Sequence, residues 1–278
     1  MTEERSNRLL EINSFAALHF HKALTSLHYD DPVRLWLTNR EIGVEAIDIF
    51  KIGFAEPGFS GFPKVLQGQG FTRDIAVECG LIRERRDLPN EYVSVFRRHI
   101  MFPIQNEGGH FVGFVGRNLI PSCAPKYLGP IKSPVFGDTA KFYGIHQAKV
   151  AIQEAKQVIL VEGVLDAIVL YMSGIQNVVS ILGTGFTDEQ ALKLKSTGVE
   201  VIAWFDGDEA GWYGLYRLLH MLRNRGIPAR GVWNRRLPEP RDYVKTMGPE
   251  HTRRRIEKAW PFEKLFNSTL PRTSIIDS

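Results

Sequence analysis

The sequence predicts a mixed α/β protein, in which an N-terminal α/β region precedes a domain with a mostly parallel sheet flanked by helices. Short apolar runs rich in Val and Ile, at residues 158–161, 178–182 and 199–205, alternate with segments of helical period. This alternation is typical of parallel strands joined by crossover helices. Upstream, residues 95–104 and 111–115 predict two strands around a turn at residues 106–109, an antiparallel pair.

The N-terminal region begins with predicted helices. Apolar residues recur at three- and four-residue spacing over residues 9–27, which predicts an amphipathic helix with His19 on its apolar side, where a packed histidine is commoner than a ligand. Asp30, Asp31 and Pro32 favour the start of a second helix that runs to Leu37. Further helices are expected over residues 43–50 and over residues 71–80, the latter with Thr72 as its N-cap. The charged stretch at residues 81–90 predicts an exposed loop.

The elements that follow the first parallel strand are also marked in the sequence. Thr187 and Gln190 fit a capping box that opens a helix over residues 188–196. A helix is expected from Gly211 to Arg223, and residues 230–233 are expected to form the last strand of the sheet. A short helical tail is expected over residues 249–278.

Composition limits the classes of protein that fit. The 278 residues are 44% hydrophobic, enough for two domains with buried cores, and carry a formal net charge of +4. No apolar run approaches the roughly 18 residues that a membrane span needs, and the N-terminus does not resemble a secretory signal. We therefore expect a cytoplasmic protein with no membrane partner. Cys79 and Cys123 lie too far apart to provide a four-ligand zinc site, so no zinc is predicted.

Acidic residues follow two of the predicted parallel strands. Glu162 follows the first strand, with Asp166 four residues later, and Asp206 and Asp208 follow the third. Ligands of open parallel sheets bind beyond the carboxyl ends of the strands. Clustered carboxylates without His or Cys suit Mg²⁺ or Mn²⁺. The alternative is that these acids only cap helices, with Asp208 or Glu209 at the start of the next one.

Positive charge and aromatic residues gather before the sheet domain. Residues 81–150 hold ten Lys or Arg against five Asp or Glu. Arginines and lysines interleaved with aromatic residues suit single-stranded nucleic acid, where phosphate neutralisation and base stacking dominate. The alternative is an ordinary solvated charged face, and composition alone favours that alternative.

Two motifs, VEGVLD and DGDEAG, fall in order and resemble the TOPRIM signature. The upstream blocks FRRHIMFPIQNEGGHFVGFVGRNL, APKYLGP and KFYGIHQA resemble the catalytic polymerase core of DnaG-type bacterial or phage primases. The resemblance covers residues 15–248 and implies a metal-dependent nucleotidyltransferase that makes RNA primers on single-stranded DNA. It implies Mg²⁺ or Mn²⁺ at Glu162, Asp206, Asp208 and Glu239, with Asp166 as a further catalytic residue that orients the site. It also favours nucleotide or nucleic-acid binding by Arg97, Arg98, Arg117, Lys126, Tyr127 and Lys141.

The sequence departs from the resembled family at several positions. His99 stands where the family usually has an arginine, and Asp138 where a lysine is common. The family usually has Asp-Pro-Asp where this chain has Glu239-Pro240-Arg241, which puts a second metal site in doubt. Full-length members of the resembled family also carry a zinc ribbon and a helicase-binding domain, and we expect neither within these 278 residues.

These observations predict a primase core with three parts: residues 1–155 as a basic, nucleic-acid-binding region, residues 156–248 as the TOPRIM catalytic domain, and residues 249–278 as the tail. The expected partners are a single-stranded DNA template, nucleoside triphosphates, and a replicative helicase or a separate zinc-ribbon protein, in a bacterial cell or a phage- or plasmid-infected host. Two alternatives stay open, namely a TOPRIM metal-dependent nuclease and a binding module that has lost catalysis.

Overall fold

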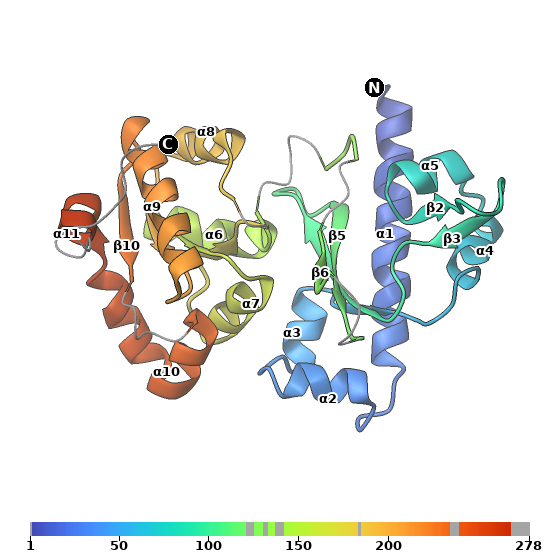
Figure 1. Cartoon of the computed structure of the whole chain (residues 1–278), viewed down its shortest axis with the longest axis horizontal. Coiled ribbons are helices and arrows are strands. Elements are labelled where there is room, and N and C mark those ends of the chain that lie inside the picture. Colours follow the sequence, from blue (N-terminus) through green and yellow to red (C-terminus); the bar gives the residue numbers. More distant parts are fainter. Residues whose placement is uncertain are drawn as a thin grey trace. The chain divides into compact units, whose positions relative to one another are not determined.

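The computed structural model describes residues 2–120, 125–129, 133–136, 142–182, 185–233 and 239–267 (Figure 1). The chain divides into two compact units, Met1–Lys149 and Val150–Ser278. Both units are mixed α/β, as predicted from the sequence.

The first unit is built around a long helix, α1 (Glu3–Thr25), which contacts strands β1 and β5. It begins at Glu3 rather than at residue 9 because Thr2 caps it, its side chain accepting a hydrogen bond from the Arg5 N–H at 3.3 Å. The predicted second and third helices are confirmed, whereas a further helix over residues 61–68 was not predicted. These helices are α2 (Pro32–Thr38), α3 (Val44–Ile49), α4 (Gly61–Gly68) and α5 (Arg73–Glu78).

The main sheet of this unit is antiparallel and has the order β1-β4-β5-β6. The predicted pair is present as β4 (His99–Gln105) and β5 (Phe111–Asn118), flanked by β1 (Gly53–Ala55) and β6 (Tyr127–Leu128). The prediction of a loop at residues 81–90 is wrong in part, because β2 (Ile82–Glu84) pairs with β3 (Tyr92–Ser94). Thr72 is the N-cap residue of α5, as predicted, although its side chain makes no capping hydrogen bond.

The sheet of the second unit has the order β11-β10-β9-β7-β8. The three apolar runs form β7 (Gln157–Val161), β8 (Val178–Ser180) and β9 (Glu200–Trp204), which pair in parallel as predicted. β10 (Ala229–Val232) continues the parallel sheet, but it is not the last strand. β11 (Trp260–Pro261) pairs with it antiparallel at the edge.

α6 (Ile145–Ala155) leads from the first unit into the second. The described helices that follow it are α7 (Val164–Met172), α8 (Asp188–Thr197), α9 (Glu209–Asn224), α10 (Pro240–Glu257) and α11 (Phe262–Asn267). From β7 the chain crosses to β8 on one side, and from β8 and β9 it crosses in the opposite direction. Since such crossovers are right-handed, α7 lies on one face of the sheet and α8 and α9 on the other. The strand order therefore reverses between β7 and β9, the position at which open α/β sheets bind ligands.

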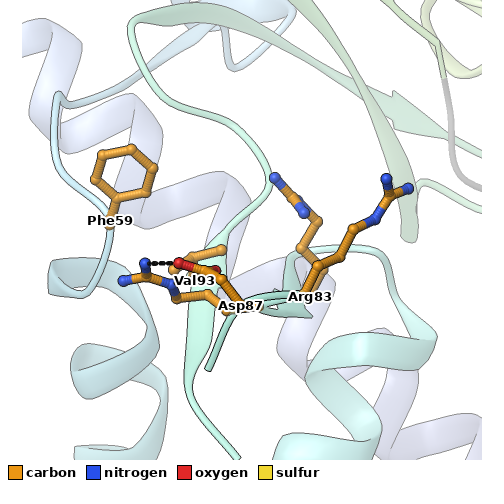
Figure 2. A pocket seen from close by; sticks show the side chains of 6 residues that line it. Phe59, Arg83, Asp87 and Val93 are labelled. Atoms are coloured by element: carbon orange, nitrogen blue, oxygen red, sulfur yellow. Dashed lines mark hydrogen bonds and ion pairs between the residues drawn. The ribbon is translucent and has the colours of Figure 1, made fainter. Parts of the chain in front are cut away.

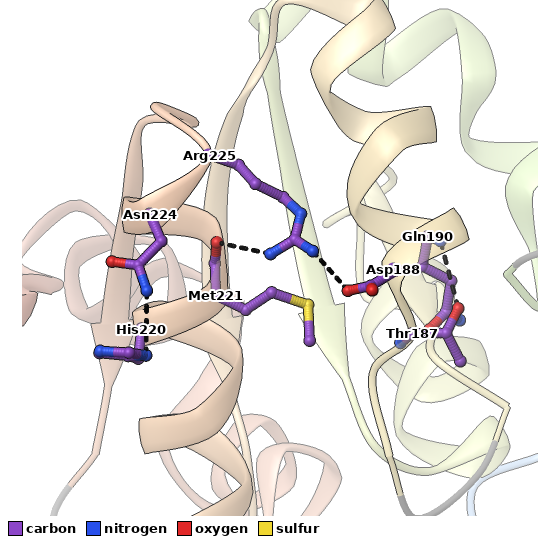
Figure 3. A network of polar contacts seen from close by, with 7 residues as sticks. All are labelled: Thr187, Asp188, Gln190, His220, Met221, Asn224 and Arg225. Carbon is purple, nitrogen blue, oxygen red and sulfur yellow. Dashed lines mark hydrogen bonds and ion pairs between the residues drawn. The ribbon is translucent and has the colours of Figure 1, made fainter.

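Helices α8 and α9 are joined at their ends by polar contacts (Figure 3). The predicted capping box is confirmed, because Thr187 and Gln190 exchange side-chain-to-backbone hydrogen bonds at 3.2 and 2.9 Å. Arg225, which follows α9, donates to the Met221 carbonyl and forms an ion pair with Asp188 at 2.5 Å. These contacts fix the start of α8 against the end of α9.

Helices α10 and α11 follow β10 in the chain. α10 begins at Pro240 and is interrupted at Gly248, which has a φ of 79°, so the predicted boundary at residue 248 coincides with a break between two helical segments. α11 packs on α9 and β10. In the described ranges, no helix combines the length and apolar character that crossing a membrane requires.

Candidate active site

The predicted acidic residues lie at the carboxyl ends of two neighbouring strands. β7 and β9 pair in parallel with Leu160 opposite Ala203, so Glu162 and Asp206 leave the sheet at the same edge. Burial, followed by the carboxylates of Asp206 and Asp208, raises the pKa of Glu162 to about 7. Burial and then Asp208 also raise the pKa of Asp206. The structure thus brings these three predicted residues within electrostatic reach of one another.

The carboxylates of Glu162, Asp206 and Asp208 do not converge on one point in this structure. Across the part of the chain that the structure describes, no three His, Cys, Asp or Glu side chains stand together closely enough to hold an ion. The chemistry of the donor set nevertheless suits a cation, because half-buried carboxylates that raise each other's pKa are stabilised by positive charge. The oxygen-only set of Glu162, Asp206 and Asp208 suits Mg²⁺ or Mn²⁺.

Asp208 also caps a helix, as the alternative interpretation of this acid expected. Its Oδ1 accepts a hydrogen bond from the Gly211 N–H at 2.7 Å at the start of α9. A side chain at Gly211 would place its Cβ 2.2 Å from the Asp206 carbonyl oxygen, so only glycine allows this close approach. The cap and the glycine together hold the loop that carries Asp206 and Asp208 against α9.

Asp166 lies on α7 and is almost fully buried, with 4% of its side chain exposed. Burial raises its pKa and the positive charge of Arg241 opposes that rise, with a net pKa of about 6. The backbone N–H of Arg241 donates to Asp166 Oδ1 at 3.2 Å, and Arg241 Nη1 lies 3.5 Å from the same oxygen. Asp166 therefore contacts the start of α10.

Glu239, the fourth predicted metal ligand, lies next to α10 and forms an ion pair with the Arg241 guanidinium. Arg241 Nε also lies 3.9 Å from Asp242 Oδ1. The acidic site consequently contains an arginine in addition to its carboxylates.

A cavity of about 640 Å³ opens beside Glu162 within the second unit. One face of α9 lines it with residues at three- and four-residue spacing, which the sequence analysis did not single out although that spacing was visible. The cavity combines apolar walls with Glu162 and the cation of Arg217. The α9 residues that line it are Ala210, Tyr213, Gly214, Arg217, Leu218 and Met221.

In the first unit, the predicted basic residues stand against aromatic rings. The Arg97 guanidinium lies 4.3 Å from the ring centre of Phe59, which is 60% exposed. Arg117 lies 5.0 Å from the ring of Tyr127 and 5.6 Å from that of Trp36. Sequence reasoning missed Phe59 and Trp36, because both precede the basic stretch and reach it only through folding.

The other residues that the sequence analysis discussed for this surface differ in their exposure to solvent. Arg98 is exposed and has a φ of 54°, and Lys126 is exposed beside Tyr127 in the chain. The His99 side chain is buried, and burial lowers its pKa, so it adds no cation to the surface. Lys141 and Asp138 lie outside the described residues, as do Cys123 and part of the loop at residues 183–185.

A basic hollow of about 670 Å³ lies between Phe59 and the strand pair β2-β3 (Figure 2). Arg85 is held in an ion pair with Asp87 at 2.5 Å. By contrast, no carboxylate in the described ranges pairs with Arg83 or Arg86, which also line the hollow. Unpaired arginines beside an exposed aromatic ring favour phosphate binding and base stacking.

Comparison with known proteins identifies both units. Residues 19–149 match the N-terminal domain of the DNA primase catalytic core, and residues 156–232 match a Toprim domain. The chain belongs to the DnaG-type primase catalytic-core family. A DNA primase of Halalkalibacterium halodurans is 34% identical over 248 residues, which are 89% of this chain and 41% of that protein. The chain thus spans less than half the length of this relative.

Solved primase structures share the fold. The RNA polymerase domain of Mycobacterium tuberculosis primase DnaG is 27% identical, with a TM-score of 0.85 over 93% of this chain and 85% of that one. A DnaG primase catalytic domain bound to single-stranded DNA is also 27% identical, with a TM-score of 0.83 over 98% of this chain and 88% of that one. These relatives establish the predicted fold class and its primase-type architecture.

Proposed function

We propose that the chain is the catalytic core of a DNA primase, which synthesises short RNA primers on single-stranded DNA from nucleoside triphosphates. The observation that carries this proposal is the position of Glu162 and the Asp206–Asp208 pair at the point where the strand order reverses, in a chain whose two units both match primase-core families. We place the reaction in the cytoplasm of a bacterial cell or of a phage- or plasmid-infected host.

In this proposal each carboxylate has a role in holding Mg²⁺ or Mn²⁺. Glu162, Asp206 and Asp208 are the ligands, and Glu239 is a fourth candidate. When bound, the metal supplies positive charge to the reacting phosphate and to the leaving pyrophosphate. The chain's own contribution is orientation, because the Asp208 cap and the buried Asp166 fix the loops that present the carboxylates.

The template is proposed to lie on the aromatic and basic residues of the first unit. Arg97 beside Phe59, and Arg117 beside Tyr127 and Trp36, combine a cation with a ring on which a base can stack. Arg98, Lys126 and Lys141 are proposed to add phosphate contacts. A replicative helicase or a separate zinc-ribbon protein is proposed as the partner that supplies template recognition.

The test is one assay with a single-stranded DNA template, labelled nucleoside triphosphates and Mg²⁺ or Mn²⁺. Products are scored for synthesis and the template is scored for cleavage in the same reaction. Metal-dependent synthesis that stops in EDTA supports the proposal. Template cleavage without synthesis would identify the metal-dependent nuclease, and DNA binding with neither reaction would identify the binding module.

A further inference from the structure

Arg241, in the first turn of α10, brings a permanent positive charge into the acidic site. Its Nη1 lies 3.5 Å from Asp166 Oδ1, its Nη2 forms an ion pair with Glu239, and its Nε lies 3.9 Å from Asp242 Oδ1. A single guanidinium thus faces three carboxylates.

Contacts of both the backbone and the side chain of Arg241 fix the position of this guanidinium. The backbone N–H of Arg241 donates to Asp166, whose side chain is 4% exposed, and α10 packs on α7. Pro240 occupies the first position of α10 and restricts the backbone there. The Arg241 side chain itself is 27% exposed, so it is partly withdrawn from solvent. The contacts therefore describe a built ion-pair network rather than a loose surface pair.

The influence of Arg241 extends towards the proposed metal ligands. A divalent cation bound by Asp166 or Glu239 would have to approach a guanidinium already in contact with both carboxylates. Like charges at such separations repel strongly in a partly buried site.

We propose that Arg241 is a fixed internal cation that occupies the Asp166–Glu239 half of the acidic site and confines divalent metal to the Glu162–Asp206–Asp208 half. Arg241 is then a positioning residue, and Glu239 is its partner rather than a metal ligand. The inference rests on the proposed metal-binding function of the acidic set.

The test counts bound Mn²⁺ on the purified chain by calorimetric titration and by electron paramagnetic resonance. The wild type is expected to bind one ion. Arg241→Gln removes the charge and is expected to bind a second ion. Its affinity for this second ion should exceed that of the wild type by about tenfold or more. Arg241→Lys keeps the charge and is expected to remain at one ion. Arg254→Gln is the matched control, because it removes an exposed arginine of the same helix that pairs with Glu250.

The wild-type measurement decides the question even if Arg241→Gln fails to fold. Two Mn²⁺ ions of similar affinity on the wild type would overturn the proposal, and so would a folded Arg241→Gln variant that still binds one ion. Primer synthesis is measured separately on the same preparations. Synthesis by a wild type that binds two ions would refute the role of Arg241 alone, whereas the expected ion counts without synthesis would refute the proposed reaction alone.

Discussion

Replacing Glu162 by glutamine is expected to stabilise the metal-free protein at neutral and alkaline pH. The folded chain raises the pKa of this carboxyl from an ordinary value of 4.5 to about 7. The folded state therefore binds the Glu162 proton more tightly than the unfolded state does. Consequently the contribution of Glu162 to the free energy of unfolding is fully present below pH 4.5, falls as pH rises towards 7, and is lost above that pH.

The size of the effect follows from the same shift. One pKa unit corresponds to about 1.4 kcal/mol. The full shift would give about 3 kcal/mol, but Glu162 is only partly buried and is coupled to Asp206 and Asp208, so we expect about 1–2 kcal/mol. Glutamine has the same shape and no charge, so Glu162→Gln should lose none of this stability as pH rises.

The assay is urea unfolding in EDTA at several pH values from 4.5 to 8.5. The stability difference between Glu162→Gln and the wild type should grow between pH 4.5 and 7 and stay constant above that range. Glu154→Gln is the control, because Glu154 is an exposed glutamate on α6. At pH 8, Mg²⁺ should stabilise the wild type but not Glu162→Gln. A difference that is independent of pH would refute the reasoning.

The remaining predictions concern activity. Asp206→Asn and Asp208→Asn should each abolish synthesis and metal-induced thermal stabilisation while the fold survives, since asparagine can still cap α9; activity of both variants, or of the wild type in EDTA, would contradict the metal assignment. Alanine at Arg97, Arg117 or Lys126 should weaken single-stranded DNA binding. It should also lower the slope of log affinity against log salt concentration by about 0.7 for each lost phosphate contact. A triple variant with unchanged affinity and slope would indicate a solvated face. The chain alone should extend an annealed primer far better than it starts one, because initiation must position two nucleotides and a template together; efficient, sequence-specific initiation without a partner would refute this.

The sequence predicted those elements whose signals are local. The parallel strands β7, β8 and β9 are continuous apolar runs, and the capping box at Thr187 consists of residues three positions apart. Both signals exist before the chain folds. The same holds for the acids that follow β7 and β9, because the end of a strand and the next residue are adjacent in sequence.

The missed elements depend on partners far away in the chain. β2 and β11 are short, and their residues become strands only because β3 and β10 offer backbone groups to pair with. In the same way, Phe59 and Trp36 become part of the basic surface only where folding brings Arg97 and Arg117 over their rings. No periodicity within these segments could have revealed such contacts.

Asp208 illustrates why sequence alone could not choose between a metal ligand and a helix cap. Both roles select a carboxylate at the end of a strand and the start of a helix, so they predict the same residue. The structure makes the two roles compatible, because the cap engages Oδ1 with the Gly211 N–H and a carboxylate has a second oxygen. The cap then limits the rotation of the side chain. In the proposed metal site, an Asp208 side chain that is already oriented would lose less conformational entropy on binding the cation.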